Sequence, residues 1–203
     1  MPSSGRSASV SIGAATEYEN VTFGREASVP QRLECVDFTD CTFTGLEFRG
    51  LRLLSCRFFD CRFERVDASS ADFTDCTFRG TTFYDSKFLG INWTILRALQ
   101  SPRWERCLLD GSCYQALQLE SAEWLECRLR EADFSECNLK KARFTGSQLE
   151  GANFNAANLR HADFTGASGL LFDPKHVQLE QTQIELDALL RMAGALGLRV
   201  AGS

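Results

Sequence analysis

The sequence predicts an all-β solenoid, and three observations support this fold class. A large apolar residue recurs at every fifth position from Phe23 to Trp93, with few exceptions, and again from Trp104 to Phe164. These positions hold 14 of the 16 phenylalanines in the chain. An α-helix has a period of 3.6 residues and a flat strand a period of two, so neither produces this spacing. A five-residue repeat sustained over this length is typical of a chain that coils and stacks on itself.

In most units of the second series, a small residue lies two positions before the large residue. In the second series, 11 of the 13 small positions hold Ala, Cys or Ser. If the backbone turns a corner once in each five-residue unit, the small and large positions both point inward and the other three positions face water. The large residues of the second series alternate between aromatic and Leu, as in Trp104, Leu109 and Tyr114. This alternation predicts an even number of sides in each coil, with aromatic residues stacked on aromatic residues.

Several units carry a recognisable motif. Ala132-Asp133-Phe134, Ala152-Asn153-Phe154 and Ala162-Asp163-Phe164 resemble the A-(D/N)-(L/F)-x-x signature of the pentapeptide-repeat family. This resemblance implies a right-handed quadrilateral β-helix with four units in each coil. With about 4.8 Å between stacked strands, the two series then make seven to eight coils and a rod roughly 36 Å long. Such a rod is filled by its own side chains and offers no cavity for a substrate.

The chain divides into three predicted parts. Residues 1–15, rich in Ser, Ala and Gly, are expected to be a flexible N-terminal segment or a loose cap. Residues 16–171 are expected to form the β-helix, and residues 172–203 a C-terminal helical cap. Trp93 and Trp104 are eleven positions apart, so one extra residue lies within residues 94–103 and predicts a bulge there. Pro102, which cannot donate a ladder hydrogen bond, supports a local break. A functional hinge and a tolerated insertion without a role both fit this break.

The C-terminal residues carry helix signals. Thr182-Gln183-Ile184-Glu185 has the sequence of a capping box, and an apolar face follows it. A cap is required because an open solenoid end exposes apolar side chains and backbone groups. The ending Leu189–Met192 through Leu196–Val200 resembles the C-terminal segment of gyrase-protecting members of the family, the quinolone-resistance and albicidin-resistance proteins. Gly90–Thr94 resembles a segment of the latter. This resemblance implies a homodimer joined end to end through the cap, with the contact residues Ile184, Leu189, Met192, Leu196 and Leu198.

The same resemblance implies a function. It suggests a DNA-mimicking rod that binds DNA gyrase, with topoisomerase IV as a related target, and that protects or modulates the enzyme against a topoisomerase poison. A structural or scaffold repeat protein with another protein partner is the alternative. The net charge of −5 gives the rod about one charge per 7 Å, whereas duplex DNA carries one per about 1.7 Å. Mimicry therefore has to rest on the shape of the rod and on a local acidic patch.

The predicted acidic patch lies between residues 120 and 136 and is expected to spread over adjoining faces of the rod in its C-terminal half. It consists of six carboxylates, accompanied only by Arg128 and Arg130: Glu120, Glu123, Glu126, Glu131, Asp133 and Glu136. An ordinary solvated surface of mixed charge fits the same residues, because the outward positions have to be polar. A basic stripe is also expected on one side, formed by Lys140, Lys141, Arg160 and His161. No long loop interrupts the repeat.

Other classes of function are disfavoured. Seven of the nine cysteines occupy small inward positions, and only Cys35 and Cys113 are expected to be accessible. Without a C-x-x-C motif and with only two histidines, no metal site is expected, nor is a cofactor. No nucleophile–base set or phosphate-binding loop indicates an enzyme. No apolar segment approaches the membrane-spanning length of about 18 residues, and no signal peptide is recognised. The sequence therefore predicts a cytoplasmic protein that binds neither membranes nor nucleic acid directly.

Overall fold

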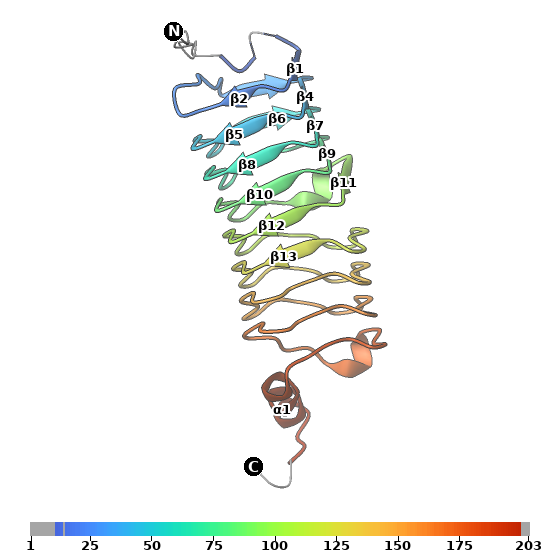
Figure 1. The fold of residues 1–203 in the computed structure, drawn as a ribbon. Helices are drawn as coiled ribbons and strands as arrows, with labels where there is room; N and C mark the ends of the chain where they lie inside the picture. Colours follow the sequence, from blue (N-terminus) through green and yellow to red (C-terminus); the bar gives the residue numbers. More distant parts are fainter. Residues whose placement is uncertain (1–10, 14, 200–203) are drawn as a thin grey trace, which may run out of the picture.

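The chain forms a parallel β-solenoid that ends in a single α-helix (Figure 1). The computed structural model describes residues 11–13 and 15–199. The predicted fold class is therefore confirmed. Each strand is very short, and its central or last residue is buried, because only one residue per strand points into the rod. The strands of the first two coils are β1 (Glu17–Glu19), β2 (Thr22–Phe23), β3 (Arg32–Glu34), β4 (Asp37–Thr39), β5 (Thr42–Thr44) and β6 (Arg52–Leu54).

The later strands continue the same stack. They are β7 (Arg57–Phe59), β8 (Arg62–Glu64), β9 (Thr77–Arg79), β10 (Thr82–Tyr84), β11 (Ala98–Gln100), β12 (Arg103–Glu105) and β13 (Glu123–Leu125). A five-stranded sheet in the order β1-β4-β7-β9-β11 forms the first side of the rod, and a six-stranded sheet in the order β13-β12-β10-β8-β5-β2 forms the second side. The fourth side begins with the pair β3-β6. Isolated parallel bridges, such as Glu47 to Asp67, form the third side between them.

The register of the ladder gives the size of one coil. Phe38 lies opposite Phe58, and Phe43 opposite Phe63, so each strand pairs with the strand four five-residue units away. Four units therefore complete one coil, and the cross-section has four sides. This register confirms the four units per coil that the resemblance implied. It also means that neighbours along the rod are separated by four units of sequence.

The corners between units have a left-handed backbone. Between residues 35 and 166, every corner residue but one has a positive φ, in the range expected for the left-handed region. Most of them are not glycine; Asp60 and Glu131 are examples, with φ of 53° and 56°. The exception is Ile95, which lies in a 3-10 turn over Trp93–Ile95. A β-branched residue is strongly disfavoured in the left-handed conformation, which explains why this corner takes another form.

Stacked rings fill the interior. Phe144, which is fully buried, lies parallel to Trp124 with ring centroids 4.7 Å apart and parallel to Phe164 at 4.9 Å. Edge-to-face contacts join the columns, as between Phe134 and Phe144 at 5.3 Å. Offset stacks and edge-to-face pairs are the favourable arrangements of aromatic rings. The predicted stacking of aromatic residues on aromatic residues is thus confirmed.

The small positions also make hydrogen bonds. Cys76 Sγ donates to the carbonyl of Leu53 at 3.0 Å, and Thr81 Oγ1 donates to the carbonyl of Phe58 at the same distance. The acceptor belongs in each case to a large residue in the preceding coil. As predicted, seven cysteines are buried, whereas Cys35 is exposed and Cys113 half-buried. A cysteine here therefore acts as a small side chain with a weak donor.

The first described residues close the N-terminal end of the rod. Ile12 is 2% exposed, and its amide donates to the carbonyl of Ser28 at 3.0 Å. The Tyr18 hydroxyl donates to the carbonyl of Ser11 and accepts from the amides of Gly13 and Ala15. Residues 11–13 and 15 therefore lie as a cap on the first coil, which is one of the two arrangements that the sequence left open for residues 1–15. Residues 1–10 and 14 lie outside the described residues.

The β-ladder continues beyond residue 171. Bridges join Asn158 to Gln178 and Asp163 to Gln183, so the β-helix extends past its predicted end. Thr182 is not a helix cap: its Oγ1 donates to the carbonyl of Leu159 at 2.8 Å, as small-position residues do elsewhere in the rod. Helix α1 (Leu186–Ala195) follows, with Glu185 as an N-cap residue whose side chain makes no capping hydrogen bond. The predicted capping box is therefore wrong.

The register break is present where the sequence predicted it. Phe78 lies opposite Leu99, and Phe83 opposite Trp104, so both steps are one residue longer than a regular coil. The following step, from Trp104 to Trp124, returns to the regular length. The extra residue thus lies between Trp93 and Leu99, directly after the 3-10 turn. Beyond it, each strand again pairs with the strand 20 residues further along the chain.

Candidate interaction surfaces

The surface of the rod, and not its interior, carries the candidate sites. A charged groove with a volume of about 240 Å³ lies along the corner between the fourth and first sides. Two bidentate ion pairs cross it, between Arg57 and Asp37 and between Arg97 and Asp75. Because both arginines are already paired with carboxylates, the groove has no excess charge with which to select a ligand.

The six carboxylates of the predicted acidic patch lie around one coil. Glu120 is on the first side, Glu123 on the second and Asp133 on the fourth, as the neighbouring ladder bridges show. Glu126, Glu131 and Glu136 occupy three different corners with positive φ. The segment from 120 to 136 covers most of a coil of four units, so these residues encircle the rod. The structure does not bring the six together on one side.

Ion pairs neutralise two of the six. Glu123 binds both Arg103 and Arg143, each at 2.8 Å, and Glu120 lies 3.7 Å from Lys140. The predicted patch therefore reduces to four carboxylates that have no salt bridge among the described residues: Glu126, Glu131, Asp133 and Glu136. Asp133 lies on the fourth side, and Glu131 and Glu136 lie at the two corners of that side. Glu126 lies at the corner between the second and third sides. The basic stripe is likewise partly compensated, since Arg160 lies 3.6 Å from Glu180.

The sequence reasoning missed a second group of carboxylates at the N-terminal end. Glu17 and Glu19 lie on the first strand of the first side, and Asp40 and Asp60 occupy the adjoining corner in successive coils. All four are exposed, and none has a salt bridge within the described part of the chain. Asp40 and Asp60 are four units apart in the sequence. Because one coil contains four units, this spacing places them at the same corner in successive coils.

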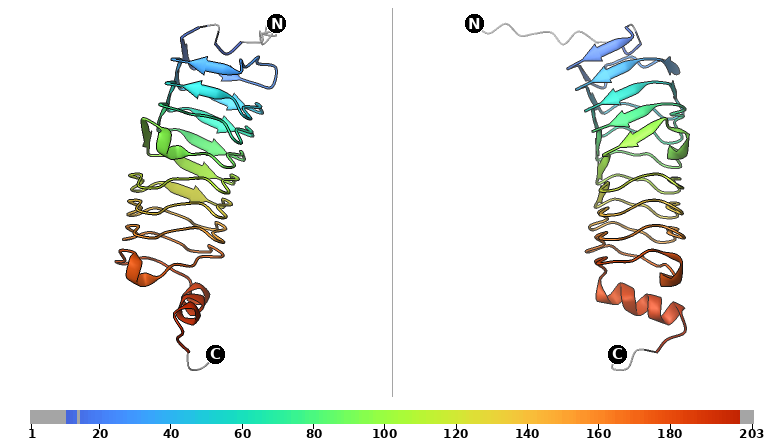
Figure 2. Two further views of the ribbon diagram at one scale, coloured as in Figure 1. Left: turned by 180° about the vertical axis from the view of Figure 1, so that it is seen from behind. Right: turned by 90° about the vertical axis from the view of Figure 1, so that its right-hand side faces the viewer.

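The C-terminal end presents a leucine surface. Helix α1 lies across the end of the rod (Figure 2) and turns Ala188 and Met192 toward it, with exposures of 1% and 3%. The opposite face of the helix exposes three leucines at helical spacing. Leu196 and Leu198, in the segment after the helix, are also exposed. These five exposed leucines are here called the leucine surface: Leu186, Leu189, Leu190, Leu196 and Leu198.

Two of the predicted dimer-contact residues do not lie on this surface. Met192 is buried against the last coil, and Ile184 is a half-buried residue of the ladder that packs on the core. They were chosen because they share a helical spacing with Leu189 and Leu196, but that spacing does not show which face the rod covers. Leu189, Leu196 and Leu198 are accessible, as predicted.

Asp67, on the third side, is a buried carboxylate with a shifted pKa. Burial raises the pKa of Asp67, but hydrogen bonds from Ser69 and from Arg49 at 2.7 Å outweigh it and lower the pKa to about 2. A lowered folded-state pKa stabilises the fold at pH values above the unfolded-state value, and this stabilisation is lost as the pH falls toward 2.

We expect Asp67→Asn to lower the free energy of unfolding by up to about 2 kcal/mol at pH 7 and by much less near pH 2.5. Urea unfolding at the two pH values measures this difference. Asp60→Asn, at an exposed corner, is the matched control and should leave stability almost unchanged. An equal loss at both pH values for Asp67→Asn would show that the carboxylate charge contributes nothing.

No helix among residues 11–13 and 15–199 is long and apolar enough to cross a membrane. Within the same residues, no cluster of three or more His, Cys, Asp and Glu side chains has the arrangement of a metal site.

Comparison with known families identifies the repeat. The model described as Pentapeptide repeat region matches residues 97–168, and the model described as Pentapeptide repeats (8 copies) matches residues 56–92. Together these matches cover more than half of the chain. The chain belongs to the pentapeptide-repeat family. A comparison with curated proteins gave no match.

Several solved structures match this chain. A trypsin-treated variant of QnrB1, a plasmid-mediated fluoroquinolone resistance protein, is 20% identical with a TM-score of 0.52, and the match covers 92% of this chain and 98% of that chain. HetL, involved in heterocyst differentiation regulation in the cyanobacterium Nostoc sp., is 18% identical with a TM-score of 0.34, covering 87% and 86%. A pentapeptide-repeat protein from the Arabidopsis thaliana thylakoid lumen is 16% identical with a TM-score of 0.30, covering 57% and 73%.

Proposed function

We propose that this pentapeptide-repeat protein binds DNA gyrase in the manner of a DNA mimic and protects or modulates the enzyme against a topoisomerase poison. The observation that carries the proposal is the similarity to QnrB1, a fluoroquinolone resistance protein, which extends over nearly the whole of both chains. A continuous, filled rod of stacked coils is also the shape that a groove for duplex DNA accepts. The protein acts in this proposal as a binding protein and carries out no chemical step.

A homodimer is part of the proposal. The five exposed leucines at the C-terminal end would be covered if a second copy docked on the same surface, so that two rods join end to end. A two-fold interface of this kind uses the same patch on both subunits. Joining the rods doubles the length of the proposed mimic.

The four carboxylates without ion pairs are the proposed gyrase contacts. Glu126, Glu131, Asp133 and Glu136 lie in the C-terminal half, toward the proposed dimer junction. Basic side chains that bind DNA phosphates also bind such carboxylates, and this attraction weakens as salt screens the charges. The complex should therefore weaken with rising salt concentration.

A supercoiling assay tests the proposal. Purified protein is titrated into gyrase reactions with and without a quinolone or an albicidin-type poison. We expect restored supercoiling in the presence of a poison, or inhibition at micromolar protein in its absence. No effect in either reaction would reject the gyrase proposal and favour the alternative, a scaffold protein with another protein partner.

Charge reversal locates the contact surface. The triple variant Glu126→Lys, Glu131→Lys and Glu136→Lys should lose its effect on gyrase by at least about tenfold, since each lost interfacial charge contact costs on the order of 1 kcal/mol or more. The matched control reverses three exposed carboxylates at the other end of the rod, with Glu19→Lys, Asp40→Lys and Asp60→Lys. An equal loss in both triple variants would show that only net charge matters and would reject the assignment of these contacts.

The alternative rests on one observation. The surface has mixed charge, and many of its acidic residues are paired with arginine or lysine in the neighbouring strand or coil, as Glu123 is with Arg103 and Arg143. A scaffold protein needs only such a solvated surface with a local docking site. The supercoiling assay separates the two proposals.

A further inference from the structure

The packing pattern inside the rod changes around the register break. On the first side, stacked phenylalanines, such as Phe58 and Phe78 with centroids 4.7 Å apart, give way to leucine at Leu99. On the fourth side, leucine is replaced by aromatic residues from Phe73 onward, and Phe73 stacks on Trp93 at 6.0 Å. An aromatic column thus moves from the first side to the fourth across the coils that flank the break, and the two halves have differently built cores.

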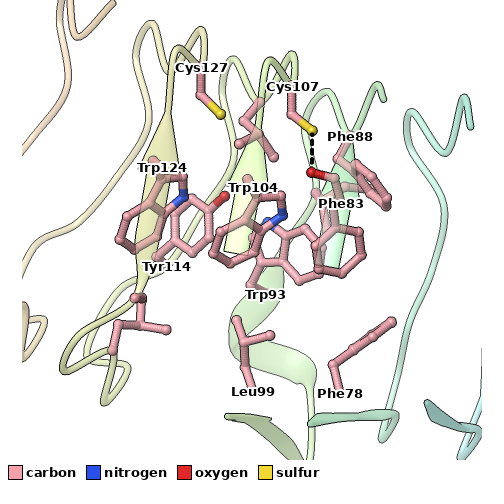
Figure 3. Close-up of a cluster of buried hydrophobic side chains, with 14 of the residues drawn as sticks. Phe78, Phe83, Phe88, Trp93, Leu99, Trp104, Cys107, Tyr114, Trp124 and Cys127 are labelled. Atoms are coloured by element: carbon pink, nitrogen blue, oxygen red, sulfur yellow. Dashed lines mark hydrogen bonds between the residues drawn. The ribbon is translucent and has the colours of Figure 1, made fainter. Parts of the chain in front are cut away.

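Three tryptophans and a tyrosine fill the point of change (Figure 3). Trp93, Trp104 and Trp124 are the only tryptophans of the chain, and all three are fully buried. Trp104 lies 5.6 Å from Trp93 and 5.1 Å from Trp124, measured between ring centroids, and Trp93 lies 6.0 Å from Tyr114. Large rings fill the space that a change of packing pattern leaves.

This cluster contains polar atoms that lack hydrogen bonds. The three indole Nε1 atoms and the Tyr114 hydroxyl are buried, and none has a hydrogen-bond partner of acceptable geometry within the described part of the chain. Burial raises the pKa of Tyr114 well above its usual value, although the nearby indoles of Trp124 and Trp93 act in the opposite direction. An unsatisfied buried donor costs about 1–3 kcal/mol, so this part of the core is less stable than the hydrocarbon-filled coils on either side.

Long backbone hydrogen bonds also gather here. The three longest coil-to-coil bonds outside the paired strands are from Ala98 to Cys76 at 3.4 Å, from Arg103 to Thr81 at 3.4 Å and from Glu123 to Pro102 at 3.2 Å, and the carbonyl of Cys76 also accepts a bond from Arg97 at 2.9 Å. Comparable bonds elsewhere in the described coils are 2.7–3.1 Å long. Pro102 has no amide hydrogen and cannot make the turn bond that Ala122 makes to Leu119 at the same corner one coil later.

We propose that the register break is a joint at which the rod opens before either half unfolds. In a solenoid each coil contacts only its neighbours, so the weakest interface between coils divides the stack into separate cooperative units. The ion pairs that cross the break, such as Arg97 with Asp75 and Arg106 with Asp85, involve side chains that are 42–68% exposed, and such pairs add little stability. A joint between the two halves allows the rod to bend and to fit a curved binding surface. This holds for any protein partner.

Hydrogen exchange and urea unfolding test the joint in the unmodified protein. Amides of residues 94–103 should exchange about tenfold faster or more than those of the flanking coils, and tryptophan emission should shift to the red at a lower urea concentration than the loss of the strand signal in circular dichroism. The three tryptophans make emission a local probe, because all of them lie in the break or the coils next to it. Coincident transitions together with uniform exchange across the rod would overturn the proposal.

A pair of variants adds a directional test. Tyr114→Phe removes an unpartnered hydroxyl and keeps the ring, so it should slow exchange at residues 94–103 and raise the urea midpoint seen by emission. Tyr84→Phe removes a hydroxyl from a tyrosine on the outside of the rod, over which Arg62 stacks at 3.8 Å, and should change neither. If Tyr114→Phe accelerates exchange at the break, the hydroxyl stabilises the junction, and the proposed cause of its weakness is wrong.

Discussion

Replacing Leu186 and Leu189 together by aspartate is expected to convert the proposed dimer to a monomer without unfolding the rod. Both side chains are exposed, by 71% and 48%, so their substitution disturbs the core little. Aspartate near the start of α1 also suits the helix dipole. Each leucine buried at an interface contributes about 1.5–3 kcal/mol, and both copies lose two of them.

Sedimentation measures the mass, and circular dichroism confirms that the coils remain folded. The control is Leu89→Asp, which introduces the same change at a half-buried leucine on the third side, far from the C-terminal end. The control should remain dimeric. If the unmodified protein sediments as a monomer, or if Leu186→Asp/Leu189→Asp keeps the mass of the unmodified protein, the leucine surface is not a dimer interface.

Met192→Asp separates docking of the helix from dimerisation. Met192 is 3% exposed and lies between α1 and the last coil, so a carboxylate there should detach the helix and expose the end of the rod. The sequence-based choice of Met192 as a dimer contact would have led to this variant first. If Met192→Asp lowers the sedimentation mass, either detachment of the helix or loss of a dimer contact explains the result. If Leu186→Asp/Leu189→Asp lowers the mass, loss of the dimer contact is the explanation.

Phe144→Ala is expected to lower the free energy of unfolding by about 3–5 kcal/mol. Phe144 is fully buried and stacks between Trp124 and Phe164, with edge-to-face contacts to Phe134 and Phe154 at 5.3 and 5.7 Å. Its removal leaves a cavity that the neighbouring coils cannot close, because the ladder on each side fixes their spacing. Urea unfolding followed by circular dichroism measures the loss.

Phe59→Ala is the matched control for this substitution. Phe59 points outward from β7 and stacks with Arg79, whose guanidinium carbon lies 4.6 Å from the ring centroid. Its removal should cost about 1 kcal/mol or less, as expected for an exposed cation–π contact. If the two variants lose the same stability, the central column of rings does not dominate the stability of the rod.

The end of the β-helix shows why part of the fold was not read from the sequence. Leu179 and Ile184 lie one full coil after Leu159 and Phe164, so the five-residue spacing does continue beyond residue 171. Gly169 and Pro174 occupy the intervening large positions and interrupt the visible pattern. Thr182 matched a capping motif, but a small-position hydroxyl in a coil has the same sequence neighbours, and only the contact with Leu159 distinguishes the two.

By itself, the sequence determined the inward positions and the site of the register break, because a five-residue period states directly which side chains must avoid water. The tertiary structure alone decided which charges meet, since neighbours along the rod are four units apart in sequence and Glu123 pairs with Arg103 and Arg143 instead of adding to an acidic patch. It also decided which face of α1 remains open. A helical period defines an apolar face, but the shape of the last coil selects the residues that the rod covers and the leucines that stay exposed.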